Sequence, residues 1–410
     1  AIDLQNTTTS RTFIQYTVDN AVIAGSREMQ AGKSQDEIRA YITNFVNGVI
    51  KSKGYAMSCK DPEVAFTQGT QNIDVTMKCA QETTLTELIG YQHLNFTVTS
   101  GSTYGIGDVD VSFVFDISGS MSGSSKIGAL KEAAEDAVDI LLPKDAGEDM
   151  GDVRIAMVSY SNMVNAGQYF TKVTNQLPYR VYTDTYETTQ QVCVRYKKNG
   201  SCREWEYQTV ETTTTKAVNN TCVKERLGTN AYNDEDPGPN AWLEAAEAKY
   251  SQSYYGGSWS TESCNDAVEP LPLTDSRTDL YDYIDDLNAS GGTGGHIGIA
   301  WGWYMIAPEW KSVWPSGSDL LAYNAPDSAN AIILMTDGDF LNWYNTGQGN
   351  SFDQAKKFCD TIMSDTTIRI YTVAFQAPTQ GKNILNYCAS GGDFAFTPDS
   401  ADELKDAYAK

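Results

Sequence analysis

Histidine is almost absent from this 410-residue chain, which contains only His93 and His296. Neither lies in an HExxH motif or in the sequence context of a serine nucleophile. The glycine-rich segment 101–107 also lacks the Gly-x-x-x-x-Gly-Lys-Ser/Thr pattern of a phosphate-binding loop. Because no general base can be identified, we expect that the protein is not an enzyme.

Long apolar runs and positive charge are scarce as well. No run reaches the roughly 18 apolar residues that a membrane-spanning helix needs. The chain has 30 Lys and Arg against 53 Asp and Glu, a net charge of −23. This excess repels phosphate groups, so we expect neither nucleic acid nor an anionic membrane surface as a partner. The chain begins without a methionine or a signal peptide, and we expect that an exporting or anchoring segment has been removed.

The cysteines form no CxxC pair and have no histidine nearby in sequence, which makes a zinc site improbable on spacing alone. Their number is even and they are widely spread, a pattern that indicates four disulfides and an oxidising compartment. Eight cysteines allow about 105 pairings. Chain order favours pairs of sequence neighbours: Cys59–Cys79, Cys193–Cys202, Cys222–Cys264 and Cys359–Cys388.

The first hundred residues predict a small α+β unit, which we assign to residues 1–105. Residues 1 to about 30 have helical apolar spacing, and Ser34 with Glu37 forms a capping box for a second helix that ends at Gly54. Segment 84–90 could form one helical turn or more. Alternating patterns predict strands at 63–68, 72–79 and 94–100, clipped by the Cys59–Cys79 pair.

From residue 106 onward the pattern changes to strongly apolar strands that alternate with helices. Such alternation predicts a Rossmann-like α/β domain, with a central, mostly parallel sheet flanked by helices, over residues 106–410. We expect strands at 110–116, 153–160, 330–336, 368–375 and 393–398, and helices at 126–142, 278–287, 296–306, 352–363 and 400–409.

Residues from about 172 to 270 interrupt this alternation as a disulfide-rich insertion. Segment 181–215 predicts a long polar hairpin. A two-residue Asn199–Gly200 turn would leave its two cysteines out of register, whereas a loop centred between Lys197 and Lys198 places Cys193 opposite Cys202. We expect the longer loop, and we expect a helix at 241–250 after the hairpin.

Oxygen-bearing side chains gather where the predicted strands end. Asp116, Ser118 and Ser120 follow the first strand of the larger domain, Thr293 lies in a Gly-flanked loop, and Asp337 follows the strand at 330–336. In a parallel α/β sheet these strand ends meet at one edge. Three hydroxyls and two carboxylates, without nitrogen or sulfur, suit a hard divalent cation: Mg²⁺, or alternatively Mn²⁺ or Ca²⁺. With so few carboxylates, the cation could accept a partner's carboxylate as a further ligand.

Each part of this interpretation has a plainer alternative. Asp-x-Ser-x-Ser alone is more often a helix cap than a metal site, and only Thr293 and Asp337 favour the metal. The acids at 110 and 339 are expected to be solvated, and His296 to make a hydrogen bond at a helix start. Residues 301–304 could form a binding stripe but are expected in the core. The hairpin also contains a group of basic residues that could form either a docking point for a partner or an ordinary charged loop. These are Arg195, Lys197, Lys198 and Arg203.

The set Asp116, Ser118, Ser120, Thr293 and Asp337 resembles the metal-ion-dependent adhesion site of von Willebrand factor A domains. All five positions match in order, on a fitting strand-helix background. In that family the serines bind the metal directly, and the other three residues bind it directly or through water. The resemblance implies a von Willebrand A-like fold with a metal-dependent binding face.

A wider resemblance covers almost the whole chain apart from much of the hairpin. Segments 1–26, 84–100 and 287–310, and the C-terminal region with Cys359 and Cys388, are similar to TadG-like proteins of the tight-adherence (Flp) pilus systems. That family carries a membrane or pilin-like helix before the stalk unit, and we expect that this helix has been removed here. The resemblance therefore implies attachment to a membrane or pilus through a missing N-terminal helix.

The implied function is metal-dependent adhesion at a bacterial cell surface or pilus, as a minor pilin or a pilus-tip adhesin. The partner would be a protein or surface that offers a carboxylate to the metal. The alternative is an envelope-anchored assembly or scaffold factor, at the cell surface or in the periplasm, that binds the major pilin or other minor pilins. An insertion that flanks the metal favours adhesion, and one that caps the metal face favours a scaffold.

Overall fold

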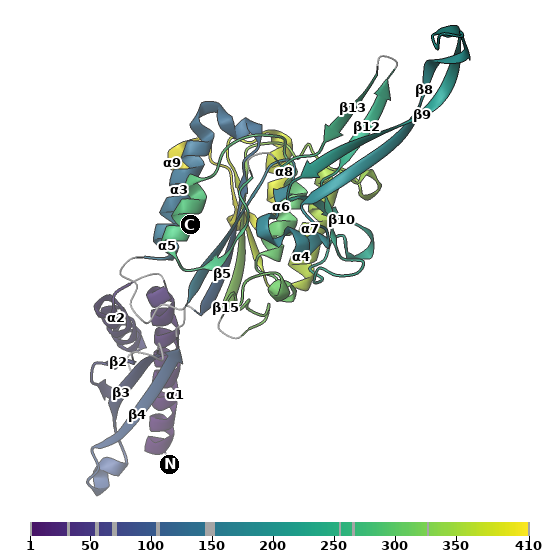
Figure 1. The fold of residues 1–410 in the computed structure, drawn as a ribbon. Helices are drawn as coiled ribbons and strands as arrows, with labels where there is room; N and C mark the ends of the chain where they lie inside the picture. The colour runs from purple at the N-terminus through teal and green to yellow at the C-terminus, as the bar shows by residue number, and fades with distance from the viewer. Residues whose placement is uncertain are drawn as a thin grey trace. The chain divides into compact units, whose positions relative to one another are not determined.

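The computed structural model describes residues 2–30, 33–53, 57–67, 72–103, 107–143, 152–253, 256–264, 267–325 and 328–408. The chain divides into two compact units, one up to Gly107 and the other from Asp108, with Asp152 grouped with the first (Figure 1). The expected boundary at 105–106 and the expected helix end at Gly54 lie outside the described residues.

The first unit is an α+β layer pair. Its antiparallel sheet has β3 at the centre, with β4 on one side and both β1 and β2 on the other. Alternate residues of β3, among them Ile73, Val75 and Met77, are buried against the two helices, as expected for a sheet with one covered face. The elements are α1 (Ile2–Gln30), α2 (Gln35–Lys53), β1 (Met57–Cys59), β2 (Glu63–Thr67), β3 (Asn72–Glu82), a 3-10 turn (Thr86–Ile89) and β4 (His93–Thr103).

Local hydrogen bonds fix the ends of this unit. Ser34 and Glu37 form the predicted capping box, with the Glu37 carboxylate 2.9 Å from the Ser34 nitrogen. The Asp3 carboxylate accepts backbone N–H groups of the Thr84–Thr86 turn, and these bonds lower its pKa to about 2. Helix α1 is therefore tied into the unit from its first turn. None of the helices in the described ranges is long and apolar enough to cross a membrane.

The second unit is built on a nine-stranded, mixed sheet whose centre is parallel. Its order is β11-β10-β7-β6-β5-β15-β16-β17, and β14 pairs with β6. The pairs among β6, β5, β15, β16 and β17 are parallel, and those involving β7, β10, β11 and β14 are antiparallel. The strands are β5 (Asp108–Asp116), β6 (Val153–Tyr160), β7 (Val164–Asn165), β10 (Cys222–Arg226), β11 (Leu243–Ala245), β14 (Leu271–Thr274), β15 (Ser328–Thr336), β16 (Arg369–Ala374) and β17 (Ala395–Phe396).

Helices cover both faces of this sheet, with α3, α5 and α9 on one side and α4, α6, α7 and α8 on the other (Figure 1). This is the α/β architecture that the strand-helix alternation predicts. The α-helices are α3 (Lys126–Leu141), α4 (Phe170–Thr174), α5 (Arg277–Asp285), α6 (Gly295–Tyr304), α7 (Ser351–Asp365), α8 (Thr379–Cys388) and α9 (Ala401–Tyr408), and the 3-10 segments are Gly119–Ser125, Gly167–Tyr169, Gly228–Asn230, Pro308–Ser312, Thr346–Gln348 and Gly392–Phe394.

Helix α6 forms the middle of the core. All of its residues are buried, which confirms that residues 301–304 pack internally rather than forming an exposed stripe. A Cβ added at Gly302 would overlap the Val114 side chain of β5, so a glycine at this position lets the helix lie directly on the sheet. The position of α6 matters for function because the loop that precedes it carries Thr293.

The insertion contains two antiparallel ribbons, β8 (Tyr179–Tyr196) with β9 (Cys202–Asn219), and β12 (Ala248–Ser253) with β13 (Gly256–Thr261). The long polar hairpin is present, but its predicted register is wrong. Cys193 lies opposite Trp205, and Cys202 lies opposite Tyr196. Irregularities on both strands near the turn let the two cysteines still form a disulfide.

The helix expected at 241–250 is also wrong, because the segment forms β11 and the start of β12. Leu243 and Ala245 are buried at the edge of the main sheet, where they pair with Arg226 and Val223 of β10. Pairing and burial outweigh the helical propensity of an Ala- and Glu-rich segment. The four disulfides are those between sequence neighbours: Cys59–Cys79, Cys193–Cys202, Cys222–Cys264 and Cys359–Cys388.

Candidate metal centre

The five oxygen-bearing residues singled out in the sequence come from three loops at one edge of the parallel sheet. Strands β5 and β15 are adjacent and parallel, with Phe115 opposite Met335, so Asp116 ends its strand beside Thr336, one residue before Asp337. Thr293 lies in the loop that precedes α6. The strand-end rule for parallel sheets accounts for this placement.

Direct hydrogen bonds join the side chains of two of these loops. The hydroxyl oxygens of Ser118 and Ser120 are 3.0 Å apart, and Ser120 donates to Asp337 Oδ1 at 2.6 Å. Asp116 Oδ1 accepts the Ser118 backbone N–H at 2.8 Å, and its Oδ2 accepts the Thr336 hydroxyl. Asp116 thus holds the serine loop against β15, while Ser118, Ser120 and Asp337 contact one another through their side chains.

Backbone contacts bring the third loop to the cluster. The Gly119 N–H donates to the Gly291 carbonyl at 2.9 Å, and the Thr293 N–H donates to Asn342 Oδ1 at 2.8 Å. A Cβ built on Gly338 would lie 3.4 Å from the Ser120 hydroxyl and 3.6 Å from the Thr293 hydroxyl. Both hydroxyls therefore face the same glycine, and the five residues share one small region.

The cluster combines buried carboxylates with an open rim. Asp116 and Asp337 are buried, whereas Ser120 and Gly291 are exposed. Burial raises the pKa of Asp116 to about 6. The Lys126 ammonium lies 2.6 Å from Asp337 Oδ2 and is mostly buried, so a cationic side chain already neutralises one carboxylate of the cluster.

The donor set fits a hard cation better than a soft one. It contains hydroxyl and carboxylate oxygens only, which Mg²⁺, Mn²⁺ and Ca²⁺ prefer. Across the described residues, no group of three or more His, Cys, Asp and Glu side chains is placed to hold a metal ion. Any cation held here would therefore depend on the serine and threonine hydroxyls for most of its protein ligands.

Three other candidates from the sequence lie outside the cluster. Asp110 is at the start of β5, where Arg154 binds both its oxygens at 2.9 Å, so it is a buried ion pair rather than a solvated acid. Asp339 accepts the Gly381 N–H at 2.9 Å. His296 is in the first turn of α6, as expected for a helix-start hydrogen bond, and lies 2.6 Å from the Ser351 hydroxyl.

Sequence reasoning missed the residues that hold the loops in place. Lys126 pairs with Asp337, Thr336 donates to Asp116, and Asn342 accepts from Thr293. Asn162 also accepts the Gly292 N–H, at 2.5 Å. Thr336 and Lys126 could have been proposed from the sequence, because one directly precedes Asp337 and the other opens the helix after the serine loop. Neither asparagine has such a signal.

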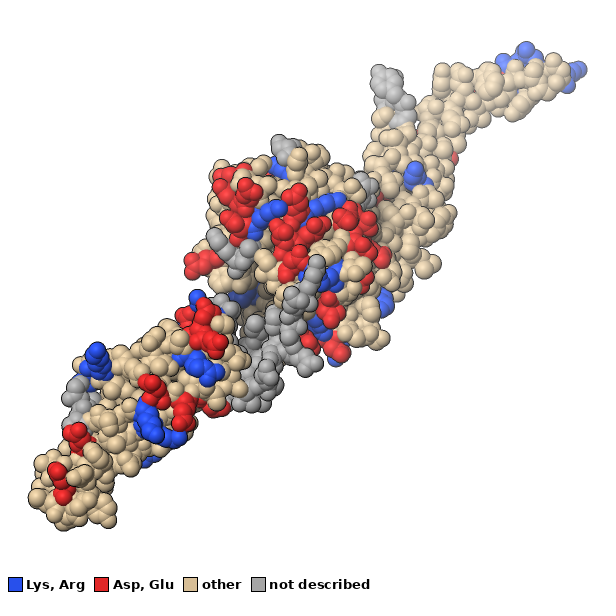
Figure 2. Space-filling view, turned by 90° about the vertical axis from the view of Figure 1, so that its left-hand side faces the viewer, with Lys and Arg blue, Asp and Glu red and all other residues tan. Residues whose placement is uncertain are grey.

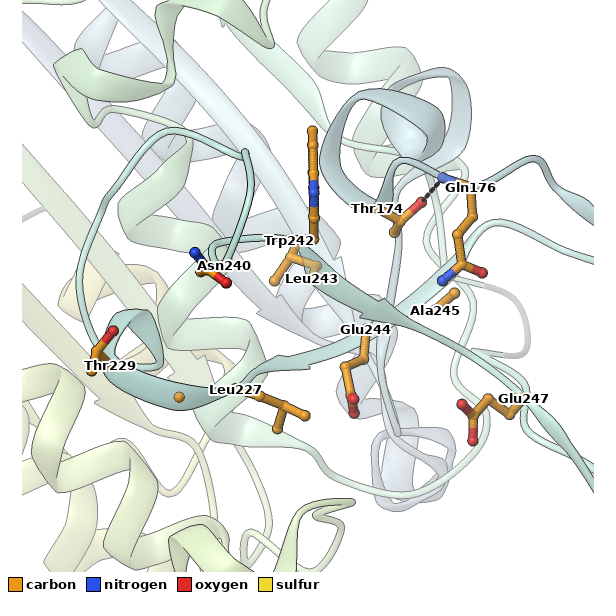
Figure 3. A pocket seen from close by; sticks show the side chains of 11 residues that line it. Thr174, Gln176, Leu227, Thr229, Asn240, Trp242, Leu243, Glu244, Ala245 and Glu247 are labelled. Atoms are coloured by element: carbon orange, nitrogen blue, oxygen red, sulfur yellow. Dashed lines mark hydrogen bonds between the residues drawn. The ribbon is translucent and has the colours of Figure 1, made fainter.

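The insertion carries a separate groove of about 630 Å³. Trp242, directly before β11, and Glu244, within it, line this groove, and Figure 3 shows Glu244 and Glu247 among its side chains. Burial raises the pKa of Glu244. Thr174 and Thr229 line this groove as well, and the Thr174 hydroxyl accepts the Gln176 backbone N–H. The strand-end cluster, in which hydroxyl and carboxylate groups are hydrogen-bonded to one another, remains the candidate site.

Comparison with known proteins does not assign this chain to a family. No family model and no curated protein matches it. Solved structures that it resembles include the von Willebrand factor domain of the type V pili tip protein Mfa5 from Porphyromonas gingivalis, at 12% identity and TM-score 0.39, covering 74% of this chain and 93% of that one.

The pilus adhesin RrgA from Streptococcus pneumoniae is matched at 9% identity and TM-score 0.39, over 86% of this chain and 48% of RrgA. Proximal thread matrix protein 1 from the mussel byssus, in a structure with a zinc-occupied MIDAS motif, is matched at 14% identity and TM-score 0.33, over 74% and 45% of the two chains. This chain thus spans about half the length of these two proteins, and such distant likenesses assign no activity to it.

Proposed function

We propose that this chain is an exported, metal-dependent adhesion protein. It holds a divalent cation, Mg²⁺ or alternatively Mn²⁺ or Ca²⁺, with Asp116, Ser118, Ser120, Thr293 and Asp337. The observation that carries the proposal is the contact between two distant loops, in which Ser120 donates to Asp337 at 2.6 Å while lying 3.0 Å from the Ser118 hydroxyl.

The bound cation would supply a Lewis-acidic position for a carboxylate of the partner. The chain's own residues define that position. Only two carboxylates are present, and the exposed Ser120 and Gly291 leave the rim accessible. Lys126 must give up its contact with Asp337 Oδ2 for that oxygen to become a ligand. Metal binding through that oxygen would therefore exchange the Lys126 ammonium for an external cation.

An adhesin of a tight-adherence pilus, as a minor pilin or tip protein, is the specific role that we propose from the sequence resemblance. The four disulfides support an oxidising compartment outside the cytoplasm. The exposed rim favours adhesion over the scaffold alternative, which a capped metal face would favour. Antibody labelling should find the protein at the pilus or cell surface. A periplasmic location would favour an assembly factor instead.

Calorimetric titration with Mg²⁺, Mn²⁺ and Ca²⁺ tests the metal site. We expect saturable binding by the wild type and at least a tenfold loss in Ser120→Ala. Ser122→Ala is the matched control, because this serine lies in the same loop but donates to the Gly119 carbonyl instead of facing the cluster. Absence of metal binding in the wild type, or equal affinity in the two variants, would contradict the proposal.

The partner's carboxylate can be tested separately with acetate as the probe. Protein-bound Mn²⁺ should accelerate relaxation of the acetate methyl protons when acetate enters the coordination shell. We expect this enhancement in the wild type and in Ser122→Ala, and its loss in Ser120→Ala. Mn²⁺ binding without an acetate effect would leave a structural metal and would refute the adhesion mechanism.

A further inference from the structure

The distal end of the β8–β9 hairpin differs in chemistry from the rest of the molecule. We define the hairpin tip as residues 193–207. Gln252 reaches the hairpin at Glu187, and beyond this level Figure 1 shows the hairpin extending past β12–β13. About ten further residues at 3.3 Å each carry the tip roughly 30 Å farther. A segment this long and polar contributes little to the core.

The hairpin tip is held in one shape. The Lys197 N–H donates to the Ser201 carbonyl at 2.8 Å, and the Gly200 N–H donates to the Lys197 carbonyl at 2.9 Å. Asn199 accepts the Ser201 hydroxyl at 2.8 Å, and Gly200 takes the positive φ of 82° that the turn requires. With the Cys193–Cys202 disulfide, these bonds reduce the conformational entropy that a binding partner would otherwise have to remove.

The hairpin tip is basic although the chain carries a net charge of −23. It has four basic residues and two acidic ones, Glu204 and Glu206, and only Arg195 forms an ion pair, a loose one of 3.8 Å to Glu204. Among the described residues, no carboxylate lies within ion-pair distance of the other three basic side chains. Figure 2 shows basic side chains at the hairpin end. The remaining basic residues are Lys197, Lys198 and Arg203.

Separation from the acidic body makes this charge effective. At physiological ionic strength, charges are screened beyond about 8 Å. The turn at the end of the tip lies roughly 30 Å past the Gln252–Glu187 contact, so the acidic side chains that Figure 2 shows on the body do not cancel its field. An anionic partner repelled by most of the surface can therefore be attracted here.

Large aromatic side chains are exposed beside these cations. Tyr196, Trp205 and Tyr207 are 67%, 57% and 73% exposed. Trp205 and Tyr207 lie two residues apart on β9 and so share one face of the ribbon, while Glu204 and Glu206 lie on the other face. One face thus combines aromatic rings with nearby positive charge and is free of both acids.

We propose that the hairpin tip binds an acidic polysaccharide of the uronic acid class. Sugar rings would stack on Trp205 and Tyr207, and the sugar carboxylates would pair with Lys197, Lys198 and Arg203. A bilayer fits less well, because the turn from Lys197 to Ser201 has no aliphatic side chain to insert. This site is independent of the metal centre and does not require it.

Retention on immobilised polygalacturonate tests the proposal, with EDTA present to silence any metal site. Fully methyl-esterified polygalacturonate keeps the ring and removes the charge. We expect the wild type to bind the acid form with an affinity that falls as salt rises, and to bind the ester at least tenfold more weakly. Equal binding to both polymers, or no binding to the acid form at low salt, would overturn the proposal.

Matched variants distinguish binding by the hairpin tip from a general effect of the protein's charge. Lys197→Glu/Lys198→Glu should weaken binding at least tenfold, whereas Lys216→Glu, an exposed lysine near the base of β9, should change it less than twofold. Trp205→Ala should weaken binding several-fold, and Tyr179→Ala at the hairpin base should not. Stronger binding of the wild type to phosphatidylglycerol vesicles or to oligo-dT than to polygalacturonate would refute a polysaccharide site.

Discussion

The strand-end cluster and the hairpin tip achieve order by opposite means. The cluster is assembled from loops that are distant in sequence, as in the Ser120–Asp337 bond between residues 217 apart, and its carboxylates are buried. The hairpin tip is local in sequence and almost fully exposed, and it is closed by a disulfide between residues only nine apart. The cluster depends on the packing of the whole unit, whereas the tip depends on a single turn.

This difference predicts which changes spread through the molecule. A change under the cluster disturbs the sheet and helices that position its loops, so stability and metal binding should fall together. A change at the hairpin tip meets solvent on most sides and should stay local. Matched substitutions in the two regions test that contrast.

Removing one disulfide from each region should give the largest difference in stability between the two regions. The Cys222–Cys264 bond closes a loop of 42 residues and is buried, and the Cys264 carbonyl accepts the Ser161 hydroxyl beside the Thr293 loop. Chain entropy alone predicts a loss of about 4 kcal/mol for Cys222→Ala/Cys264→Ala and about 2.5 kcal/mol for Cys193→Ala/Cys202→Ala. Urea unfolding followed by tryptophan fluorescence measures both.

Only the first of these variants should also lose metal affinity, because its bond lies next to the loop that positions Thr293. Calorimetry with Mg²⁺ separates the two effects. If the hairpin variant lost metal binding equally, the tip would be coupled to the cluster, and the contrast between a local and a distributed region would be wrong.

Replacing one glycine in each region should give the next largest difference in stability. A Cβ at Gly294 would overlap the Asn162 carbonyl, so Gly294→Ala must displace the backbone beside Thr293 and should cost about 1 to 3 kcal/mol. Gly200 has φ +82° with nothing within 4 Å, so Gly200→Ala should cost about 1 kcal/mol of turn strain. Thermal unfolding with and without Mg²⁺ should show weakened metal stabilisation only for Gly294→Ala, and the reverse result would refute this assignment.

The sequence was informative where structure repeats with a fixed period. The apolar runs before Asp116 and Asp337 predict parallel strands, and parallel strands place these residues at one edge, which the structure shows. The helix expected around Trp242 failed because edge pairing with β10 outweighs local propensity. The register of Cys193 failed because an irregularity near the turn leaves no mark in an alternating pattern.

The sequence likewise does not predict which side chains of one element contact residues of another. The sequence correctly predicts that Lys126 lies in a helix, but its contact with Asp337 depends on where the serine loop ends and how α3 lies on the sheet. A pattern of apolar spacing contains neither quantity. The sequence therefore does not predict Lys126, the one cationic side chain named in the cluster, as part of the site.

Replacing this lysine should have the most specific effect on the cluster. In Lys126→Met, the buried Asp337 loses the ammonium at 2.6 Å, so metal-free stability should fall by about 1 to 3 kcal/mol. The apparent affinity for Mg²⁺ should rise about threefold to tenfold, because the metal no longer displaces a bound cation. Lys131→Met is the control, since Lys131 lies on the same helix but donates to the Asp285 carbonyl.

The two measurements must change in opposite directions, which distinguishes competition from damage. A variant that is merely misfolded would lose both stability and metal affinity. A lysine that assists metal binding, for example by orienting Asp337, would also lower affinity when removed. Only a lysine that occupies the place of the metal gives weaker folding and tighter binding together, and the same result would show that the cluster, unlike the hairpin tip, is built to hold positive charge in its interior.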